Sequence, residues 1–456
     1  MATTYLTRTG TTPTTSNKYT FSCWIKRGSI GTTETLFRSY SDGSNSAQLI
    51  FDSDDTFAFQ DIVGGTTVTN LKPSNLFRDT GAWMNIIVQV DYTQAAAADR
   101  AKIFINGEEV SYSATTRQSQ NGASNLNTAA NNAIGSNRSN SSHYFTGSMS
   151  QVNFIDGTAY PATTFGSVNA TSGIWKANSS PTVTYGNNGF FLDMANSSDM
   201  GNDVSGKAND FTVGGGILTQ MQDTPDNNFA TMNPLARYYS DTSSLSNGNN
   251  TYSITSYTLN ARSTIAMPSG KWYWEVKQSA DNCRLGVCTS GFNPNIDTDD
   301  AGAYYGGSTG FGGVYIMNTG PSTNWQITNN NTSKNVTTYT NGVATVANTI
   351  LSVAVDVDAG KLWVGVNGTW LYSGDPAAGS GEQIAFTNSS PDPLQAFIGF
   401  NSVNARVAQC NFGNGFFGVT AVASSNADAA GHGLFEYAVP TGFFTLNTKN
   451  LNTYGG

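Results

Sequence analysis

Charged side chains are scarce in this chain. They make up 12% of its 456 residues, and the formal net charge is −9. Proteins that bind nucleic-acid phosphates need clustered Lys and Arg, and an anionic membrane surface repels an acidic chain. We therefore expect no nucleic-acid partner and no adhesion to a membrane.

Long apolar runs are also missing. A membrane-spanning helix needs about 18 or more consecutive apolar residues, and no such stretch occurs, so we expect no membrane insertion. The first residues, MATTYLTRTGTTPTTSNKYT, have neither the basic region nor the apolar stretch of a signal peptide. We expect the chain to fold where it is made.

Cysteine and histidine are too few and too scattered for the usual metal or redox motifs. No C-x-x-C occurs, and the only histidines, His143 and His432, are far in sequence from the cysteines. The four cysteines, each inside an apolar strand-like run, are Cys23, Cys283, Cys288 and Cys410. We favour buried free thiols over a disulfide or a zinc site.

Short apolar runs separated by turn residues dominate the chain. Examples are YTFSCWIKRG, LIFDSDDTFAF, MNIIVQVDY and AKIFINGEEV, which mix β-branched and aromatic residues and stop at Gly, Asn or Asp. This pattern predicts an all-β protein built from sandwiches. DSDD predicts a hairpin between 49–51 and 57–59, and Asn106-Gly107 predicts a tight turn. TQAAAADRA is too short for a stable helix and is predicted to be a hairpin loop.

One sequence pattern, here called the repeated phrase, occurs twice in the chain. WMNIIVQVDYTQAAAADRAKIFINGE (83–108) and SVAVDVDAGKLWVGVNGTWL (352–371) both run from an apolar strand to an Asp, a turn, Lys-x-aromatic and Asn-Gly. We predict a strand–turn–strand unit in each of two sandwiches, in which Asp91 and Asp356 end the matching strands and accept backbone N–H groups. Buried faces are expected from alternating residues: Ile103, Ile105, Leu362, Val364, Val366, and Trp272 with Trp274, opposite Tyr273 and Glu275.

Composition divides the chain into three parts. Residues 1–166 are predicted to form the first sandwich, and 235–456 the second sandwich with a C-terminal extension. Residues 167–234 are rich in Asn, Ser, Asp and Gly and contain only short apolar islands. We interpret them as a connector that packs on the sandwiches.

The two halves resemble known families. The order YTFSCWIKRG, TLFRSY, LIFDSDDTFAF, WMNIIVQVDY, AKIFINGEEV, NNAIGS and YFTGSMSQVNFIDGTAY in 1–166 resembles the laminin-G-like, concanavalin A-like jelly roll. The order GKWYWEV, RLGVCT, AYYGG, VAVDVDAGKLWVGVNGTWL and VAQCNFG in the second half resembles a SPRY domain. The resemblance implies two concanavalin A-like β-sandwiches. GFFLDMANSSDMGNDVSGKANDFT (189–212) is similar to the beginning of laminin-G-like domains but precedes the SPRY-like half, so the sandwich it joins is open.

Three further phrases resemble those of bacteriophage tail fibres and related virion proteins. They are DTPDNNFATMNP (223–234), VNGTWLYSGDPAAGSG (366–381) and YAVPTGFFTLNTKNL (437–451). The resemblance implies a protein made in the host cytoplasm and built into the virion, with other virion proteins as partners.

Several motifs of catalysis occur without their usual surroundings. GNDVSGK (201–207) matches a P-loop, but Ala208 stands where Ser or Thr is needed, and the segment lacks a preceding strand and a following helix. GGSTG (306–310) matches a nucleophile elbow at Ser308 without a helix after it. A glycosidase needs two positioned carboxylates, and Glu is sparse. We expect no enzyme activity and no catalytic residue.

Two candidate binding sites follow from the residues. Asp52, Asp54 and Asp55 at a hairpin tip are candidates for Ca²⁺, although Asp is also a common turn residue. No other cofactor is expected. A Gly-rich stretch carries rings that can stack on sugars or fill a core, namely Tyr304, Tyr305, Phe311 and Tyr315.

We interpret the chain as a non-enzymatic phage structural protein, a tail fibre or related appendage that attaches to host-surface glycan or protein through the sandwich loops. One alternative is an architectural head-decoration or tail-assembly component that contacts only virion proteins. Another is a polysaccharide depolymerase. A homo-oligomer, with a trimer as one form, is expected, and residues 1–16 are the candidate docking arm.

Overall fold

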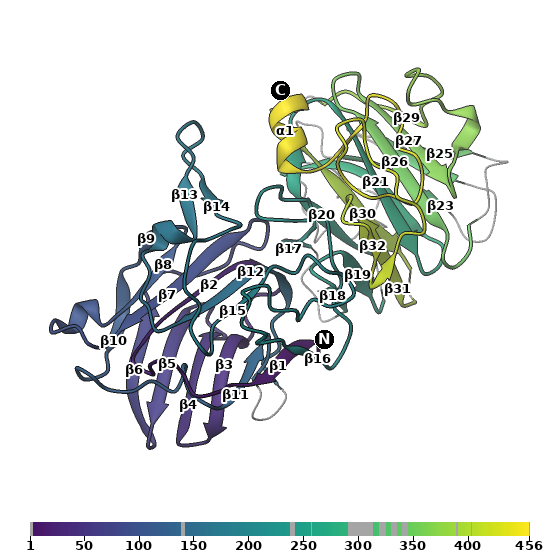
Figure 1. Cartoon of the computed structure of the whole chain (residues 1–456). Coiled ribbons are helices and arrows are strands. Elements are labelled where there is room, and N and C mark those ends of the chain that lie inside the picture. The colour runs from purple at the N-terminus through teal and green to yellow at the C-terminus, as the bar shows by residue number, and fades with distance from the viewer. Residues whose placement is uncertain are drawn as a thin grey trace. The chain divides into compact units, whose positions relative to one another are not determined.

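The computed structural model describes residues 3–137, 142–237, 242–256, 258–290, 313–318, 325–329, 335–339, 345–388, 391–402 and 404–455. Nearly all regular structure in these residues is β-strand, with one short α-helix, α1 (Thr448–Tyr454). The chain divides into two compact units, Met1–Gln220 and Met221–Gly456. Each unit contains two large sheets (Figure 1). The all-β fold class predicted from the sequence is confirmed.

The first unit, here called the first sandwich, is built from sheets of eight and six strands. In order across the larger sheet, the strands are β10 (Tyr112–Thr116), β6 (Thr66–Pro73), β5 (Phe57–Val63), β4 (Asn45–Phe51), β3 (Glu34–Asp42), β11 (Asn131–Ile134), β1 (Tyr5–Thr9) and β16 (Thr212–Gly214). Across the smaller sheet they are β15 (Phe190–Leu192), β12 (Gly147–Asp156), β2 (Lys18–Arg27), β7 (Met84–Asp91), β8 (Ala101–Ile105) and β9 (Glu108–Glu109). A separate hairpin joins β13 (Gly166–Val168) to β14 (Trp175–Ala177), and short 3-10 turns lie at Ala97–Asp99 and Ala162–Thr164.

Facing side chains of the two sheets form the core of the first sandwich. Phe21 of β2 stacks on Phe37 of β3 with ring centroids 5.4 Å apart. The predicted hairpin at DSDD is confirmed, since Phe51 pairs with Phe57. Asn106 and Gly107 have φ values of 49° and 84°, the left-handed geometry that a two-residue hairpin turn requires.

The predicted connector does not stand apart from the sandwiches. β15 extends the smaller sheet by pairing with β12, and β16 extends the larger one by pairing with β1. Phe190 and Leu192 enter the core of the first sandwich. The apolar island GFFLDM therefore contains a sheet strand, β15. The two compact units meet at Gln220 and Met221, inside the segment 167–234 that was interpreted as a connector.

The second unit, the second sandwich, also has two large sheets. One has the order β17 (Met232–Arg237), β20 (Thr258–Met267), β30 (Leu394–Asn401), β22 (Cys283–Thr289), β23 (Gly313–Asn318), β24 (Trp325–Asn329) and β25 (Asn335–Tyr339). The other has the order β18 (Ser243–Ser246), β19 (Thr251–Ile254), β31 (Arg406–Asn411), β21 (Lys271–Gln278), β26 (Ile350–Asp356), β27 (Lys361–Val366) and β28 (Thr369–Trp370). Smaller elements are β29 (Ile384–Ala385) beside β27, β34 (Phe444–Thr445) beside β21, the pair β32 (Phe416–Phe417) and β33 (Thr420–Ala421), and a 3-10 turn at Leu371–Ser373.

Strand alternation decides which side chains of β21 enter the second core. Trp272 and Trp274 are fully buried in the main core, whereas Tyr273 belongs to a separate cluster on the opposite face. This confirms the alternation predicted for β21. We call the face of the β21–β26–β27 sheet that carries Tyr273 the outer face.

The cysteine prediction is confirmed, because all four thiols are free and buried. Burial raises the pKa of each, to about 12 in Cys288, so the thiols stay protonated and unreactive. No helix in the described residues is long and apolar enough to cross a membrane.

Candidate functional site

The three aspartates at the β4–β5 turn are engaged by cations of the chain. Asp52 and Asp54 accept from the Lys72 ammonium at 3.2 and 3.4 Å. Asp55 accepts from Arg27 at 3.2 Å and from Arg78 at 3.0 Å. Their negative charge is thus largely compensated, and no group of three His, Cys, Asp or Glu residues in the described chain is arranged to hold a metal ion. Ca²⁺ at this turn stays a prediction.

Of the candidate sugar-stacking rings, only Tyr315 falls within the described residues; Tyr304, Tyr305 and Phe311 lie outside them, as does Ser308. Tyr315 is 6% exposed and stacks on Phe397 with centroids 5.7 Å apart. The Arg284 guanidinium lies 5.1 Å from the centroid of the same ring. Since protein groups contact this buried ring, we do not retain Tyr315 as a sugar-stacking residue.

The P-loop-like segment 201–207 has a structural role. The Asp203 carboxylate accepts the backbone N–H groups of Phe191, Ser205 and Asn209 at 2.8 to 2.9 Å. It joins β15 to the loop that follows, and neither a strand nor a helix flanks the motif closely. This geometry fixes a turn and offers no phosphate cradle.

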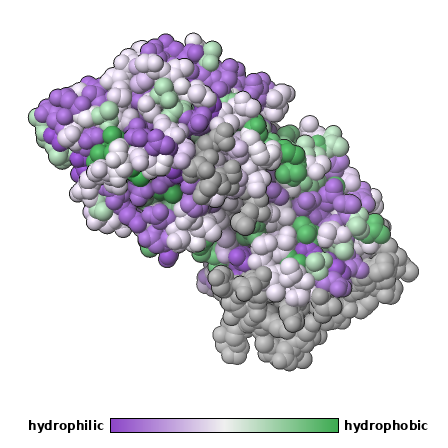
Figure 2. Space-filling model, turned by 90° about the horizontal axis from the view of Figure 1, so that it is seen from below, coloured by the Kyte–Doolittle hydropathy of each residue, from purple (hydrophilic) through white to green (hydrophobic). Residues whose placement is uncertain are grey.

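Hydrophobic residues on the face of the molecule in Figure 2 form small separate groups among hydrophilic ones. Such scattered exposure is ordinary for a folded protein. A candidate site is therefore better sought in a cavity than on an apolar patch.

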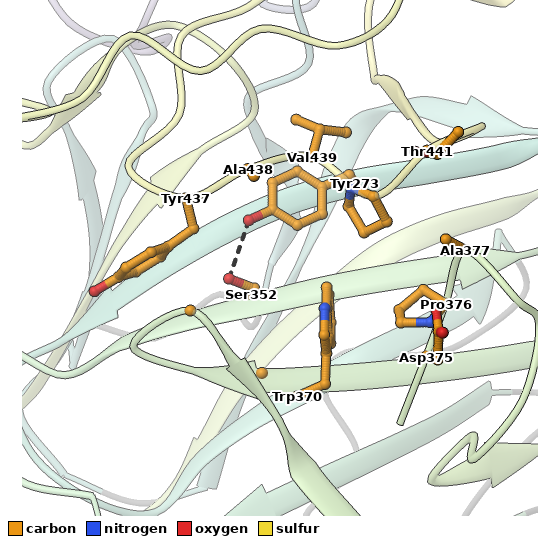
Figure 3. A pocket seen from close by; sticks show the side chains of 13 residues that line it. Tyr273, Ser352, Trp370, Asp375, Pro376, Ala377, Tyr437, Ala438, Val439 and Thr441 are labelled. Carbon is orange, nitrogen blue, oxygen red and sulfur yellow. Dashed lines mark hydrogen bonds between the residues drawn. The ribbon is translucent and has the colours of Figure 1, made fainter. Parts of the chain in front are cut away.

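A cavity of about 540 Å³ lies on the outer face of the second sandwich. This volume falls within the range typical of small-molecule sites. Strands β21, β26, β27 and β28 supply its floor and one wall, and the turn 375–377 and the segment 437–441 supply the rest (Figure 3). We call it the outer-face cavity, and we call residues 436–441 the strap.

Aromatic rings form much of the wall. Trp370 projects from β28 toward Tyr273, and the two rings meet edge to face with centroids 6.4 Å apart. Figure 3 shows Tyr437 at the other end, on the strap. Trp370 and Tyr437 are only partly buried, so their rings are accessible from the cavity.

The floor is made of small residues. Ser352 of β26 and Gly365 of β27 are direct neighbours across the sheet, and strand alternation points both positions to the outer face. The Ser352 hydroxyl lies 3.0 Å from the Tyr273 hydroxyl (Figure 3). Ser352 is 2% exposed and Tyr273 0%, so these two hydroxyls bond each other beneath the cavity.

A buried carboxylate holds the strap in place. Glu275, fully buried on β21, accepts the backbone N–H of Glu436 at 2.9 Å and that of Tyr437 at 2.8 Å. The Tyr273 hydroxyl donates to the same carboxylate at 2.9 Å. Burial raises the pKa of Glu275, and these hydrogen bonds offset part of that rise. Glu275 therefore positions both Tyr437 and Tyr273.

The strap also fits closely over a turn. Gly368 has φ 82°, and a Cβ there would lie 2.6 Å from the Tyr437 ring. Glycine is required both by the left-handed backbone and by this approach.

The cavity lining carries little charge. Among the described residues that line it, Asp375 is the one charged side chain, and none is Lys, Arg or His. Burial raises the pKa of Tyr437, with Glu436 and Glu275 adding to the effect, and burial likewise raises that of Tyr273. Both phenols thus remain neutral hydrogen-bonding groups at physiological pH.

The site residues Trp370, Tyr437, Ser352 and Gly365 were not predicted from the sequence. All but Tyr437 lie in the repeated phrase 352–371. A comparison of the two copies of the repeated phrase could have indicated the site, because Ser352 and Gly365 stand in the second copy where the first has Ile87 and Phe104.

One comparison with known proteins gives a match within the first sandwich. Residues 2–162 match the family model of the concanavalin A-like lectin/glucanases superfamily. This match covers about a third of the chain and agrees with the resemblance seen in 1–166. No curated protein matches the chain.

Solved structures with detectable likeness are distant. The TRIM65 PSpry domain is 15% identical, with a TM-score of 0.29 and coverage of 40% of this chain and 91% of that one. The SPRY domain of human HERC1 is 14% identical, with a TM-score of 0.27 and coverage of 39% and 96%. Domain 4 of the arabinanase AbnA from Geobacillus stearothermophilus, solved with arabinotriose, is 20% identical, with a TM-score of 0.26 and coverage of 33% and 65%. Likenesses this low carry no argument about function.

Proposed function

We propose that this chain is a non-enzymatic carbohydrate-binding protein of a bacteriophage particle, a tail fibre or related appendage that attaches the particle to host-surface glycans. The observation that carries the proposal is the outer-face cavity, where the accessible rings of Trp370 and Tyr437 stand beside the hydroxyl of Ser352. The concanavalin A-like lectin/glucanase match of the first sandwich supports the same class of ligand.

The chemistry of the cavity suits a sugar. Aromatic rings offer flat apolar faces with a polar tip, and one face of a pyranose ring exposes C–H groups that stack on such a surface. The exposed carboxylate of Asp375 and the hydroxyl of the partly buried Tyr437 can exchange hydrogen bonds with sugar hydroxyls. An apolar wall with a few placed polar groups is the usual composition of a small-ligand site.

The placement on a phage particle rests on the three phrases that resemble virion proteins, 223–234, 366–381 and 437–451. Two of them contain residues of the cavity and strap, Trp370 and Tyr437 among them. A single sugar site binds weakly, and repeated copies on a particle would raise the avidity by orders of magnitude.

Two experiments test this function. The purified chain is applied to immobilised envelope glycans of candidate bacterial hosts, and binding is measured by surface plasmon resonance. Saturable binding without release of soluble sugar is expected. Release of oligosaccharide would favour the depolymerase alternative, and absence of binding would favour the architectural one.

An electron-microscopy map of particles would then locate the chain on tail or head and report its oligomeric state.

A further inference from the structure

The two sandwiches carry the same unit in the same register. Lys18 pairs with Asp91 at 3.1 Å in the first, and Lys271 pairs with Asp356 at 3.2 Å in the second. Each lysine begins a strand, and its partner aspartate ends the neighbouring strand.

The following turns also agree. The Asn106 carboxamide accepts the backbone N–H of Asn85 at 2.8 Å, and the Asn367 carboxamide accepts that of Ile350 at 3.0 Å. Gly107 and Gly368 follow, with φ 84° and 82°. The copies can therefore be superposed position by position, β7 on β26 and β8 on β27.

At the floor of the outer-face cavity the two copies differ. Ile86 and Leu351 each pair with the last residue of the next strand. One position further along, Ile87 and Phe104 of the first sandwich therefore correspond to Ser352 and Gly365. Their side chains join an apolar cluster that covers this face. The second sandwich has small residues at both positions, and the Trp370 ring covers Gly365, 3.3 Å from where a Cβ would lie.

The turn glycines show the same contrast. In the first sandwich the Trp175 ring closes over Gly107, where a Cβ would lie 2.4 Å from it, and the indole N–H donates to Asn85 at 3.2 Å. In the second sandwich Tyr437 takes the corresponding place over Gly368 and stands at the edge of the cavity. Position 109 of the first copy, an exposed glutamate, corresponds to Trp370.

We propose that the outer-face cavity binds one neutral pyranose unit of a glycan, stacked on Trp370 between the turn 375–377 and the strap, and that it rejects acidic sugars. The inference deepens the proposed function and rests on it. The small residue at Gly365 lets the Trp370 ring lie over the floor, and because that ring is only partly buried it supplies a stacking surface at the cavity. Asp375 is exposed at the rim, and the described lining residues include no cation, so a sugar carboxylate is disfavoured.

The binding test uses the full chain and titration calorimetry. The probes are trisaccharides of glucose, mannose, galactose and N-acetylglucosamine, and acidic counterparts that contain glucuronate or sialate. We expect at least one neutral probe to bind. Trp370→Ala and Ser352→Ile, which restores the bulk of the first copy, should each weaken that binding at least about tenfold. Thr369→Ala, at the exposed neighbour on β28, is the matched control and should leave it unchanged.

The outcomes distinguish failure of the proposed glycan-binding function from failure of the outer-face cavity as the site. If no probe and no host glycan binds the wild-type chain, the proposed function fails. If a neutral probe binds equally to wild type, Trp370→Ala and Ser352→Ile, glycan binding stands but this site is refuted. Asp375→Asn should narrow the preference for neutral over acidic probes, and tighter binding of acidic probes by wild type would overturn the charge argument. Unchanged unfolding profiles confirm that the variants fold.

Discussion

A buried ion-pair cluster in the first sandwich allows a sharp test of the structure. Arg27, with its side chain 0% exposed, lies between Asp55 at 3.2 Å and Glu34 at 3.4 Å, and those side chains are 3% and 1% exposed. Burial opposes the charge on Asp55, but hydrogen bonds from the Gly31 N–H, Arg78 and Arg27 outweigh it and lower the pKa of the carboxyl. Asp55→Ala would leave the buried Arg27 guanidinium with one of these two carboxylate partners, Glu34.

Removing one partner of a buried ion pair destabilises a protein by about 3–5 kcal/mol. For a unit of this size, that corresponds to a fall in Tm of about 6–20 °C. Asp54→Ala is the control, because the Asp54 side chain is 60% exposed and a surface pair contributes about 0–1 kcal/mol. Hydrogen exchange in increasing urea, followed by mass spectrometry on peptides from 18–91, reports on the first sandwich alone.

The same assay decides the role of this turn. If Asp55→Ala and Asp54→Ala are equally mild, the buried ion-pair argument is refuted. If millimolar Ca²⁺ protects the wild-type peptides, and Asp52→Ala abolishes that protection, the turn is a metal site. We expect the large loss for Asp55→Ala, and the Ca²⁺ measurement decides whether the three aspartates also bind a metal ion.

Three other substitutions test separate parts of the structure by unfolding measurements. Burial raises the pKa of Asp61 to about 6. The protonated carboxyl therefore contributes fully to the stability below about pH 4, and this contribution is lost as the pH rises through 6. Compared with Asp61→Asn, the wild type should lose about 3 kcal/mol of unfolding free energy over that window, and parallel curves of stability against pH would contradict this. Gly107→Ala should cost more than 1 kcal/mol through its left-handed backbone and its contact with Trp175, whereas Gly64→Ala, with φ 57° but open space, bears the backbone cost alone. Glu275→Gln should destabilise the second sandwich by about 1–3 kcal/mol, since an amide has one oxygen for the two strap N–H groups; a neutral effect would refute the anchoring of the strap.

Much of the fold follows from local patterns. The DSDD hairpin, the Asn106-Gly107 turn and the alternation of Trp272 and Trp274 depend on neighbouring residues, and each was predicted. Local turn chemistry and strand period determine them regardless of the rest of the chain. The segment 190–192 was interpreted as part of a connector because Phe190 and Leu192 form only a short apolar island. It becomes a strand of the first sandwich by pairing with β12, which is distant in sequence.

The cavity could not be predicted from local patterns. Tyr437 reaches the site through a hydrogen bond of its backbone to Glu275, 162 residues earlier in the chain. No periodicity within the segment 437–451 indicates that contact. The aromatic candidate Tyr315 was selected because it lies near other rings in the sequence, and such clustering does not indicate that Phe397 and Arg284 contact the ring.

Comparison of the two copies gives a reason to regard the cavity as selected for a ligand. A glycine inside a strand costs about 0.5–1 kcal/mol relative to alanine. In the second sandwich this glycine, Gly365, lies under the Trp370 ring, 3.3 Å from where its Cβ would lie. The first copy has Phe104 at this position and an exposed glutamate in place of the tryptophan. The scaffold itself therefore does not require the exchange of the two residues. Local departures from a consistent scaffold are expected at functional sites, and this is the physical reason for placing the proposed sugar at Trp370.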